Sequence, residues 1–338
     1  MASINDSTLT FKPLHLTFGA ECSGVDFSQL VPEETINSIK AGVAKYGVLV
    51  FRGTQIDDAR HVAFARQLGE VDDSTPFIRP GQKFRLDPFI ELTDVGNIEE
   101  DGHIVSTDSL RHQMALGNGL FHVDCSYSPR RAGFSILRAH TLPPKGIGGG
   151  TAFADTRTAY EDLDDETKEK IKDDVLWHSL WQSRRLGAPN SEFLKLMLPE
   201  DHTMARHKLV QLHEPSGRTN LYIAWHVHHI DGWTKEDSQP VIEELLRHAS
   251  QDKYTVQVDW KNNRDTVIWD NTCVMHRACG GSYEGNYVRD MRRATVHDSS
   301  STAWGLNKQT DLRAGMFGTR MIFRQRTPLE AAAALQVK

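Results

Sequence analysis

The residues best suited to metal chemistry lie in residues 118–126, which read NGLFHVDCS. Side chains two positions apart on an extended segment point to the same side, so His122 and Asp124 can converge on one ion. With a second histidine they would form a 2-His-1-carboxylate triad, which suits non-haem Fe(II). The spacing alone is weak evidence for a metal site, because the chain holds 16 histidines and repeats the pattern at His229 and Asp231. The motif therefore predicts half of a metal site and needs another histidine.

The candidate for that histidine is His276, which follows the sequence Trp-Asp-Asn at 269–271. It comes just after an apolar strand, and we expect a loop to direct it back into the mouth of a barrel. Arg289 and Arg293 follow, four positions apart on a predicted strand and therefore on one side of it. A guanidinium binds a carboxylate through two parallel hydrogen bonds, so one of these arginines could hold a dicarboxylate.

The elements that must position these residues are mostly strands. Apolar runs bounded by turn residues predict strands at 48–51, 134–139, 175–181, 207–213, 219–224, 254–258, 265–269 and 291–297. Apolar periodicity and end signals predict helices that begin near Glu33, near Asp57 or Asp58, near Asp155 or Thr156, and around 164–172 and 241–246. Residues 72–117 are irregular apart from a strand-like 89–95, and would form either a binding loop or a surface excursion.

The same pattern predicts one β-rich domain, a sandwich or barrel with helices packed outside it. We expect a single domain over residues 1–338, with a core at about 10–300 and a C-terminal extension at about 301–338. The glycine-rich run at 143–151 lacks the order of a nucleotide-binding P-loop, and a tight turn is the simpler interpretation.

Composition narrows the classes of partner. The net charge of −6 gives no electrostatic footprint for nucleic acid or for an anionic membrane surface. Four scattered cysteines without a C-x-x-C pair indicate a reduced interior, and no stretch approaches 18 apolar residues. We therefore expect a cytoplasmic protein whose partner is a small molecule, with no nucleic-acid or membrane partner and with a homo-oligomer possible.

Four ordered blocks resemble the TauD/TfdA family of Fe(II)- and 2-oxoglutarate-dependent dioxygenases, closer to its TfdA-like side. They are NGLFHVD at 118–124, PP at 143–144 with GGGTAFAD at 148–155, WDN at 269–271 with His276, and Arg289 with RRATV at 292–296. The likeness begins near Leu16 and ends near Asp298, so it covers most of the chain. It also rejects His229 and Asp231, because no Gly-Thr block separates that pair from His276.

The resemblance implies a mainly β fold with flanking helices around a double-stranded β-helix, the jelly-roll core of cupin-like proteins. It implies His122, Asp124 and His276 as the iron ligands and as the catalytic centre. Thr151 and Arg289 match the positions at which family members bind the distal carboxylate of 2-oxoglutarate, and O2 is the other cosubstrate. The chemistry agrees, because a guanidinium and a hydroxyl both donate to a carboxylate.

Asn118 and Arg293 match positions that border the substrate in relatives. Arg293 corresponds to the family's second arginine, which predicts a small acidic substrate bearing a carboxylate or a sulfonate. Two simpler interpretations remain open at these positions. Arg293 could instead form a salt bridge to an internal carboxylate, and Asn118 could simply favour a turn.

The leading functional interpretation is oxidation of a C–H bond of that acid, with release of succinate and CO2. The alternative within the same chemistry is desaturation or oxidative cyclisation of an amino-acid-derived intermediate in a biosynthetic pathway. From other classes, a non-catalytic β-sandwich binding protein would be expected to have lost part of the set His122, Asp124, His276, Thr151 and Arg289. A metal-dependent hydrolase would need a base near a metal-bound water, and the sequence offers none.

Overall fold

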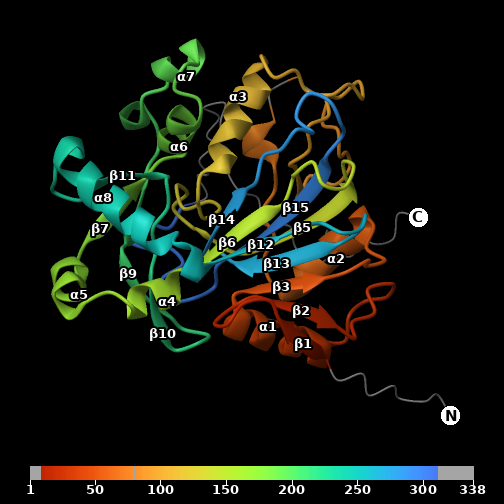
Figure 1. Cartoon of the computed structure of the whole chain (residues 1–338), viewed down its shortest axis with the longest axis horizontal. Helices are drawn as coiled ribbons and strands as arrows, with labels where there is room; N and C mark the ends of the chain where they lie inside the picture. Colours follow the sequence, from red (N-terminus) through yellow and green to blue (C-terminus); the bar gives the residue numbers. More distant parts are fainter. Residues whose placement is uncertain (1–8, 79–80, 82, 311–338) are drawn as a thin grey trace.

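The computed structural model describes residues 9–78, 81 and 83–310. Its largest element is a seven-stranded sheet with the strand order β1-β2-β3-β13-β5-β15-β4, seen in the centre of Figure 1. The strands are β1 (Thr10–Pro13), β2 (Ala20–Ser23), β3 (Val48–Phe51), β13 (Thr266–Asp270), β5 (Ala132–Thr141), β15 (Asp290–His297) and β4 (Leu92–Asp94). All neighbours pair antiparallel except β2 and β3, which are parallel.

A smaller sheet packs against one face of the large sheet. It consists of β12 (Thr255–Val258), β6 (Thr151–Asp155) and β14 (Val274–Ala278), with β6 in the middle. Buried side chains from both sheets form one cluster that includes Val50, Leu137, Phe153, Trp269 and Met291. Two sheets enclosing an apolar core give the predicted jelly-roll type of fold, and the fold class is confirmed.

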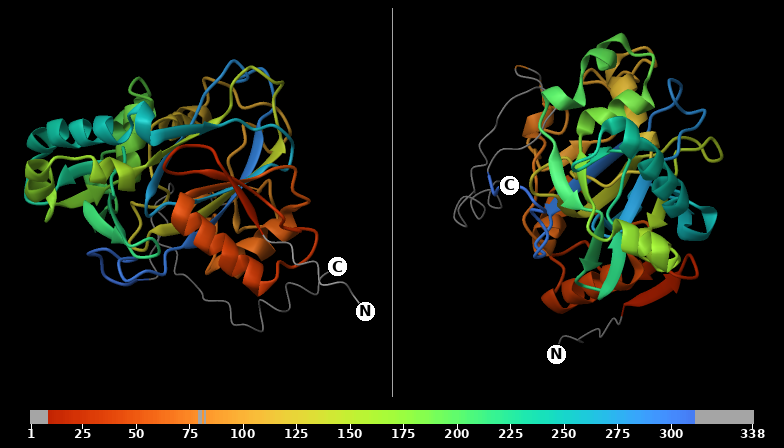
Figure 2. Two further views of the ribbon diagram at one scale, coloured as in Figure 1. Left: turned by 60° about the horizontal axis from the view of Figure 1, so that its bottom comes forward. Right: turned by 90° about the vertical axis from the view of Figure 1, so that its left-hand side faces the viewer.

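Two helices cover the other face of the large sheet, as the two views of Figure 2 show. The helices are α1 (Glu33–Tyr46) and α2 (Asp58–Leu68), and both begin where the sequence predicts. Gly47 ends α1 with a φ of 71°, a conformation that glycine adopts without strain. The side chain of Asp57 caps α2 by accepting from the backbone of Arg60.

A third region packs beside the sandwich around its own apolar core. It contains a three-stranded sheet, a hairpin and the helices α4 (Thr156–Glu161), α5 (Asp165–Ile171) and α8 (Lys235–Ala249). The sheet has the order β11 (Val227–Ile230), β7 (Val175–His178) and β8 (Ala205–Lys208), and the hairpin joins β9 (Val210–His213) to β10 (Arg218–Leu221). Further elements are α3 (Leu110–Leu116), α6 (Leu180–Gly187), α7 (Glu192–Leu196), and the 3-10 turns η1 (Thr75–Phe77), η2 (Gly117–Gly119), η3 (Pro199–Asp201) and η4 (Asp252–Tyr254).

Several local predictions were wrong. His276 lies within β14 rather than in a loop, because residues 274–278 pair with β6 along its whole length. The strand predicted for 175–181 ends at His178, and Leu180 and Trp181 open α6 instead. The strand predicted for 207–213 is interrupted at Leu209, whose backbone pairs with Asp174 and Tyr222 rather than continuing either strand.

Two further predictions concern the C-terminal residues and the membrane. Residues 301–310 of the predicted C-terminal extension form turns, and residues 311–338 lie outside the described residues. Within the described part of the chain, every helix is too short or too polar for a transmembrane span.

Candidate active site

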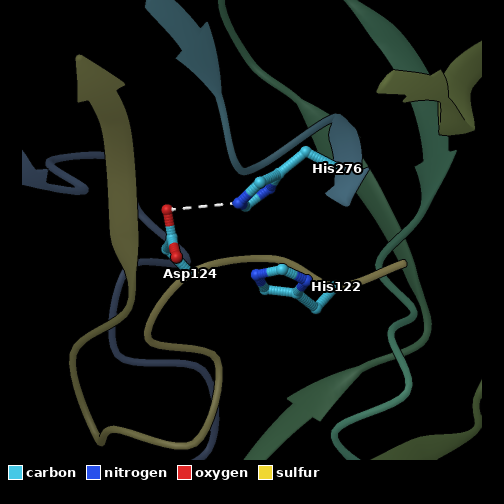
Figure 3. Close-up of side chains that lie close together, drawn as sticks. All are labelled: His122, Asp124 and His276. Carbon is cyan, nitrogen blue, oxygen red and sulfur yellow. Dashed lines mark ion pairs between the residues drawn. The ribbon is translucent and has the colours of Figure 1, made fainter. Parts of the chain in front are cut away.

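The two histidines of the predicted triad are joined through their backbones. The amide of His122 donates to the carbonyl of His276 at 2.9 Å, and the amide of His276 donates back at 2.8 Å. This pairing fixes the segment after η2 against β14 and brings the two imidazole centroids to 4.2 Å. Asp124 completes the group, and Figure 3 shows the three side chains facing one another. One ligand atom from each lies within 4.8 Å of the others, and all three residues are buried.

Neighbouring groups orient these side chains. Nδ1 of His122 lies 2.7 Å from the carbonyl of Leu120, which can only accept, so Nδ1 carries the hydrogen and Nε2 keeps its lone pair. Oδ2 of Asp124 accepts from the hydroxyl of Ser135 at 2.7 Å. The backbone amide of Asp124 donates to Oδ1 of Asn271 at 3.0 Å, which anchors the ligand segment to the end of β13. The triad is therefore held in place by the strands around it.

The charge state of the triad suits a divalent cation. Burial lowers the pKa of His122 to about 4 and that of His276 well below its usual value. Burial raises the pKa of Asp124, but the charge of Arg293 and the hydrogen bond from Ser135 lower that pKa to about 2. At neutral pH the site thus offers two neutral imidazoles and one carboxylate, the forms that bind a metal. The 3.6 Å between Nε2 of His276 and Oδ2 of Asp124 is too long for a hydrogen bond, so these atoms do not satisfy each other.

A cavity of about 180 Å³ extends from the two histidines to Arg289. Nε of Arg289 donates to the carbonyl of Gly149 at 3.0 Å, and within the described chain neither Nη has a hydrogen-bond or ion-pair partner. Thr151 lines the same cavity, and its Oγ1 accepts from Nε1 of Trp260 at 3.3 Å, which leaves its own hydrogen free to donate. Buried donors without an acceptor at the end of a cavity are suited to a carboxylate ligand.

The two predicted substrate-side residues also line this cavity. Nη1 of Arg293 lies 2.5 Å from Oδ1 of Asp124, so the internal salt bridge weighed for this residue is present. The Oδ1 atom of Asn118 accepts from Nη1 of Arg184 at 2.6 Å. The ion pair of Arg293 is compatible with a second contact to substrate, and the substrate-side roles of both residues stay predictions.

Three residues of the site were not predicted from the sequence: Arg184, Trp260 and Tyr283. Arg184 comes from α6, Trp260 follows β12, and Tyr283 lies in the loop between β14 and β15 with its ring centroid 5.9 Å from the Arg289 guanidinium. None belongs to a motif with metal-ligand or phosphate-binding spacing, so no local pattern could have indicated them.

A second group of possible ligands is His213, Asp270 and Cys273. Its polar atoms are already engaged, because Nε2 of His213 lies 2.9 Å from Oδ2 of Asp270 and Nδ1 of His213 lies 2.6 Å from the hydroxyl of Ser216. Asp270 also accepts from the amide and hydroxyl of Thr272. This group is a hydrogen-bonded network that fixes the end of β13. The competing pair His229 and Asp231 belongs to neither group of ligands found in the described residues.

Comparison with known proteins decides the family. A family profile described as "Taurine catabolism dioxygenase TauD, TfdA family" matches residues 10–295. The chain belongs to the TauD/TfdA family. The predicted enzyme class and cofactors are confirmed with it: this TauD/TfdA protein is a non-haem dioxygenase that uses Fe(II), 2-oxoglutarate and O2.

Relatives of this TauD/TfdA protein include an alpha-ketoglutarate-dependent 2,4-dichlorophenoxyacetate dioxygenase from Burkholderia sp. (strain RASC). It is 32% identical over 285 residues, which cover 84% of this chain and 92% of the relative. A pentalenolactone F synthase from Streptomyces avermitilis is 26% identical over 309 residues, covering 85% and 93%. A solved structure of AAD-2 in complex with Mn(II) and N-oxalylglycine is similar with a TM-score of 0.78 and 34% identity, covering 87% of this chain and 99% of that one.

Proposed function

We propose that this TauD/TfdA dioxygenase oxidises a C–H bond of a small organic acid that bears a carboxylate or a sulfonate. One observation carries the proposal: a single cavity joins the His122, Asp124 and His276 group to the unpaired guanidinium of Arg289. The cosubstrate and an organic substrate can therefore meet at the triad. The relative from Burkholderia, named for a phenoxyacetate, supports a carboxylate as the acidic group.

The first group of residues binds the metal. His122, Asp124 and His276 would hold the iron, and two hydrogen bonds fix which atoms face it: His122 donates to the Leu120 carbonyl, and the Ser135 hydroxyl donates to Asp124. When bound, Fe(II) activates O2 while 2-oxoglutarate is decarboxylated to succinate, and this supplies the oxidising power for the C–H bond.

The cosubstrate is placed by the far end of the cavity. Arg289, through its two free Nη atoms, and the hydroxyl of Thr151 would donate to the distal carboxylate of 2-oxoglutarate, leaving its keto-acid end for the metal. This placement leaves the side of the cavity near α3 for the organic substrate.

Of the side chains that line the cavity, Arg111 and His112 of α3 are polar, whereas Val95, Val105, Leu116 and Leu137 are apolar. They can pack around an apolar body and exclude water from the reacting C–H bond. Asn118 and Arg293 supply the polar end of the pocket, where the acidic group of the substrate would lie.

A second outcome of the same chemistry is kept as an alternative, because the chain is also similar to a pentalenolactone F synthase. Desaturation or oxidative cyclisation begins with the same removal of hydrogen as hydroxylation. The mass of the product separates the two outcomes, because hydroxylation adds one oxygen whereas desaturation or ring closure removes two hydrogens.

The proposal is tested by measuring succinate formation with Fe(II), 2-oxoglutarate and a panel of aryloxyacetates, alkyl carboxylates and sulfonates. We expect at least one acid to raise succinate above the substrate-free background and to be consumed in equal amount. The His122→Ala variant, which lacks one ligand, is the matched control and should show no acid-dependent succinate. If neutral compounds raised succinate formation and none of the acids did, the proposed substrate class would be contradicted.

A further inference from the structure

One arginine beside the cavity carries a partly buried charge without an acidic partner. Arg184 on α6 donates from Nη1 to the carbonyl of Met114 at 2.9 Å and to Oδ1 of Asn118 at 2.6 Å, and both acceptors are neutral. Its Nε is shielded from solvent and makes no hydrogen bond to the described residues. No carboxylate of the described chain lies within ion-pair distance of it, whereas the buried Arg131 and Arg157 each have an aspartate at 2.8 Å or less.

An unpaired buried charge destabilises the fold unless a ligand neutralises it. Burial lowers the pKa of Arg184, which reflects the same missing counter-charge. Arg289 is the parallel case in this cavity, and the partner proposed for it is the distal carboxylate of the cosubstrate. The other cationic side chains nearby are already paired, since Arg293 contacts Asp124 and Arg111 contacts Asp94 and Glu99.

The position of Arg184 is fixed by close packing of α6 on η2. A Cβ on Gly187 would lie 2.5 Å from the backbone nitrogen of Gly117, so the two backbones touch without a side chain between them. A Cβ on Gly117 would lie 2.8 Å from Nη1 of Arg184, so the guanidinium lies directly on this turn. The close contact between Gly117 and Gly187 therefore holds the Arg184 side chain against Asn118.

The contact also determines the orientation of the Asn118 amide. A guanidinium has only donors, so the amide atom that faces it must be the oxygen. The NH2 group of Asn118 is thereby turned away from Arg184, and it has no hydrogen-bond partner among the described residues. Because Asn118 lines the cavity, its NH2 group is available as a donor to a ligand there.

We propose that Arg184 is a positioning residue for acidic substrates: it holds Asn118 with the NH2 group toward the substrate anion and supplies the positive charge behind that donor. The inference rests on the proposed acid substrate and names the element that recognises the acid. An anion is bound through Asn118, and the guanidinium polarises this hydrogen bond from behind. A neutral substrate gains little from either effect.

The test compares an acid with its neutral amide, using 2,4-dichlorophenoxyacetate and 2,4-dichlorophenoxyacetamide as probes. Equilibrium titration into the full-length chain loaded with Mn(II) and N-oxalylglycine gives Kd without turnover, and succinate formation by the Fe(II) enzyme gives KM and kcat separately. The variants are Arg184→Gln, which removes the charge, and Arg184→Lys, which keeps it. Arg185→Gln on the same helix is the matched control, and thermal unfolding of each variant checks that it folds.

We expect the wild type to prefer the acid, and Arg184→Gln to weaken acid binding about 10- to 100-fold, because the hydrogen bond from Asn118 to the anion loses the charge behind it. The Kd for the neutral amide probe and the KM for 2-oxoglutarate should each change less than about threefold in Arg184→Gln. Arg184→Lys should recover part of the acid preference, and Arg185→Gln should match the wild type. A merely structural role would weaken acid and amide alike.

Two results would overturn the inference and differ in what they say of the proposed function. If the wild type prefers the acid and Arg184→Gln keeps the same acid-to-amide ratio, the role of Arg184 is wrong while the acid substrate stands. If the wild type shows no preference for the acid, the proposed substrate class is wrong and the role of Arg184 falls with it.

Discussion

The guanidinium of Arg293 lies directly against the carboxylate of Asp124, with 2.5 Å between Nη1 and Oδ1. The same carboxylate accepts from Ser135 through its other oxygen, so both oxygens of this predicted iron ligand are held by neighbours. A residue predicted from the family resemblance to face the substrate therefore contacts a predicted iron ligand.

Arg293→Gln should weaken iron binding. Removing the guanidinium frees Oδ1 of Asp124 and loosens the orientation of the ligand, and loss of such a partner costs about 10- to 100-fold in metal affinity or activity. Anaerobic Fe(II) titration measures the effect, with Arg293→Lys expected to recover part of it. An unchanged iron affinity together with a raised KM for the acid would instead assign Arg293 to the substrate alone.

Arg289→Gln should raise the KM for 2-oxoglutarate. The variant loses the two free Nη donors and the charge at the end of the cavity, which corresponds to about 10- to 100-fold in affinity. Succinate formation as a function of 2-oxoglutarate concentration gives the value, and iron affinity should stay the same because Arg289 does not touch the triad. A variant with a normal KM would remove Arg289 from the cosubstrate site.

Gly187→Ala should destabilise the protein by forcing α6 away from η2. The added methyl carbon would lie 2.5 Å from the nitrogen of Gly117, and neither backbone can move freely. We expect a loss of about 1–3 kcal/mol in the free energy of unfolding, the usual cost of overpacking. Gly119→Ala is the control, since its methyl carbon meets only the carbonyl of Ala278 at 4.0 Å. Equal stability of the two variants would disprove the close contact.

The stability of the fold should fall as the pH drops below about 6.5, the usual pKa of histidine in an unfolded chain. Burial, aided by the charge of Arg138, lowers the pKa of His61 to about 3, and burial lowers that of His178 to about 3. Between pH 6.5 and 3 the unfolded chain binds protons that the folded chain does not, so acid favours unfolding. Above pH 6.5 these two histidines are neutral in both the folded and the unfolded chain, so they no longer change the free energy of unfolding.

Urea unfolding of the protein and of a His61→Gln variant, measured at several pH values, tests this account. Each buried neutral histidine contributes a slope of up to about 1.4 kcal/mol per pH unit below 6.5. His61→Gln should reduce the slope by about that amount, because glutamine can still donate to the carbonyl of Ile136 that His61 Nε2 contacts at 3.0 Å. Parallel curves for the two proteins would show that His61 does not titrate in this way.

The sequence predicts the local pair of the triad better than the strand pairing that brings the third residue to it. His122 and Asp124 are two residues apart, so their convergence follows from local geometry, whereas His276 reaches them through long-range pairing of β14 with β6 and of its own backbone with that of His122. The strand β6, with which β14 pairs, begins at Thr151 directly after three glycines. The glycines indicate a turn, so the strand was not predicted from the sequence. Residues 110–116 form α3 inside a segment predicted to be irregular, because a helix of about two turns after the Ser109 cap gives only a weak periodic signal.

The importance of Arg184 could not be predicted from sequence at all. Arginine is common on the surface of helices, and what distinguishes this one is the absence of a carboxylate around it in the folded chain. Such a property depends on which elements pack together, here α6 on η2 through Gly117 and Gly187. By contrast, Arg289 could be singled out from the sequence because it follows His276 within a family pattern, although the loop between them is longer here than in relatives.

The most direct test of the account is the visible spectrum of the anaerobic protein with Fe(II) and 2-oxoglutarate. If His122, Asp124 and His276 hold iron beside the Arg289 end of the cavity, the mixture should give a weak charge-transfer band from 2-oxoglutarate bound to the metal. The band should be absent in His122→Ala and should need more 2-oxoglutarate in Arg289→Gln. A wild-type protein that binds Fe(II) at this triad but gives no band with saturating 2-oxoglutarate would contradict the account.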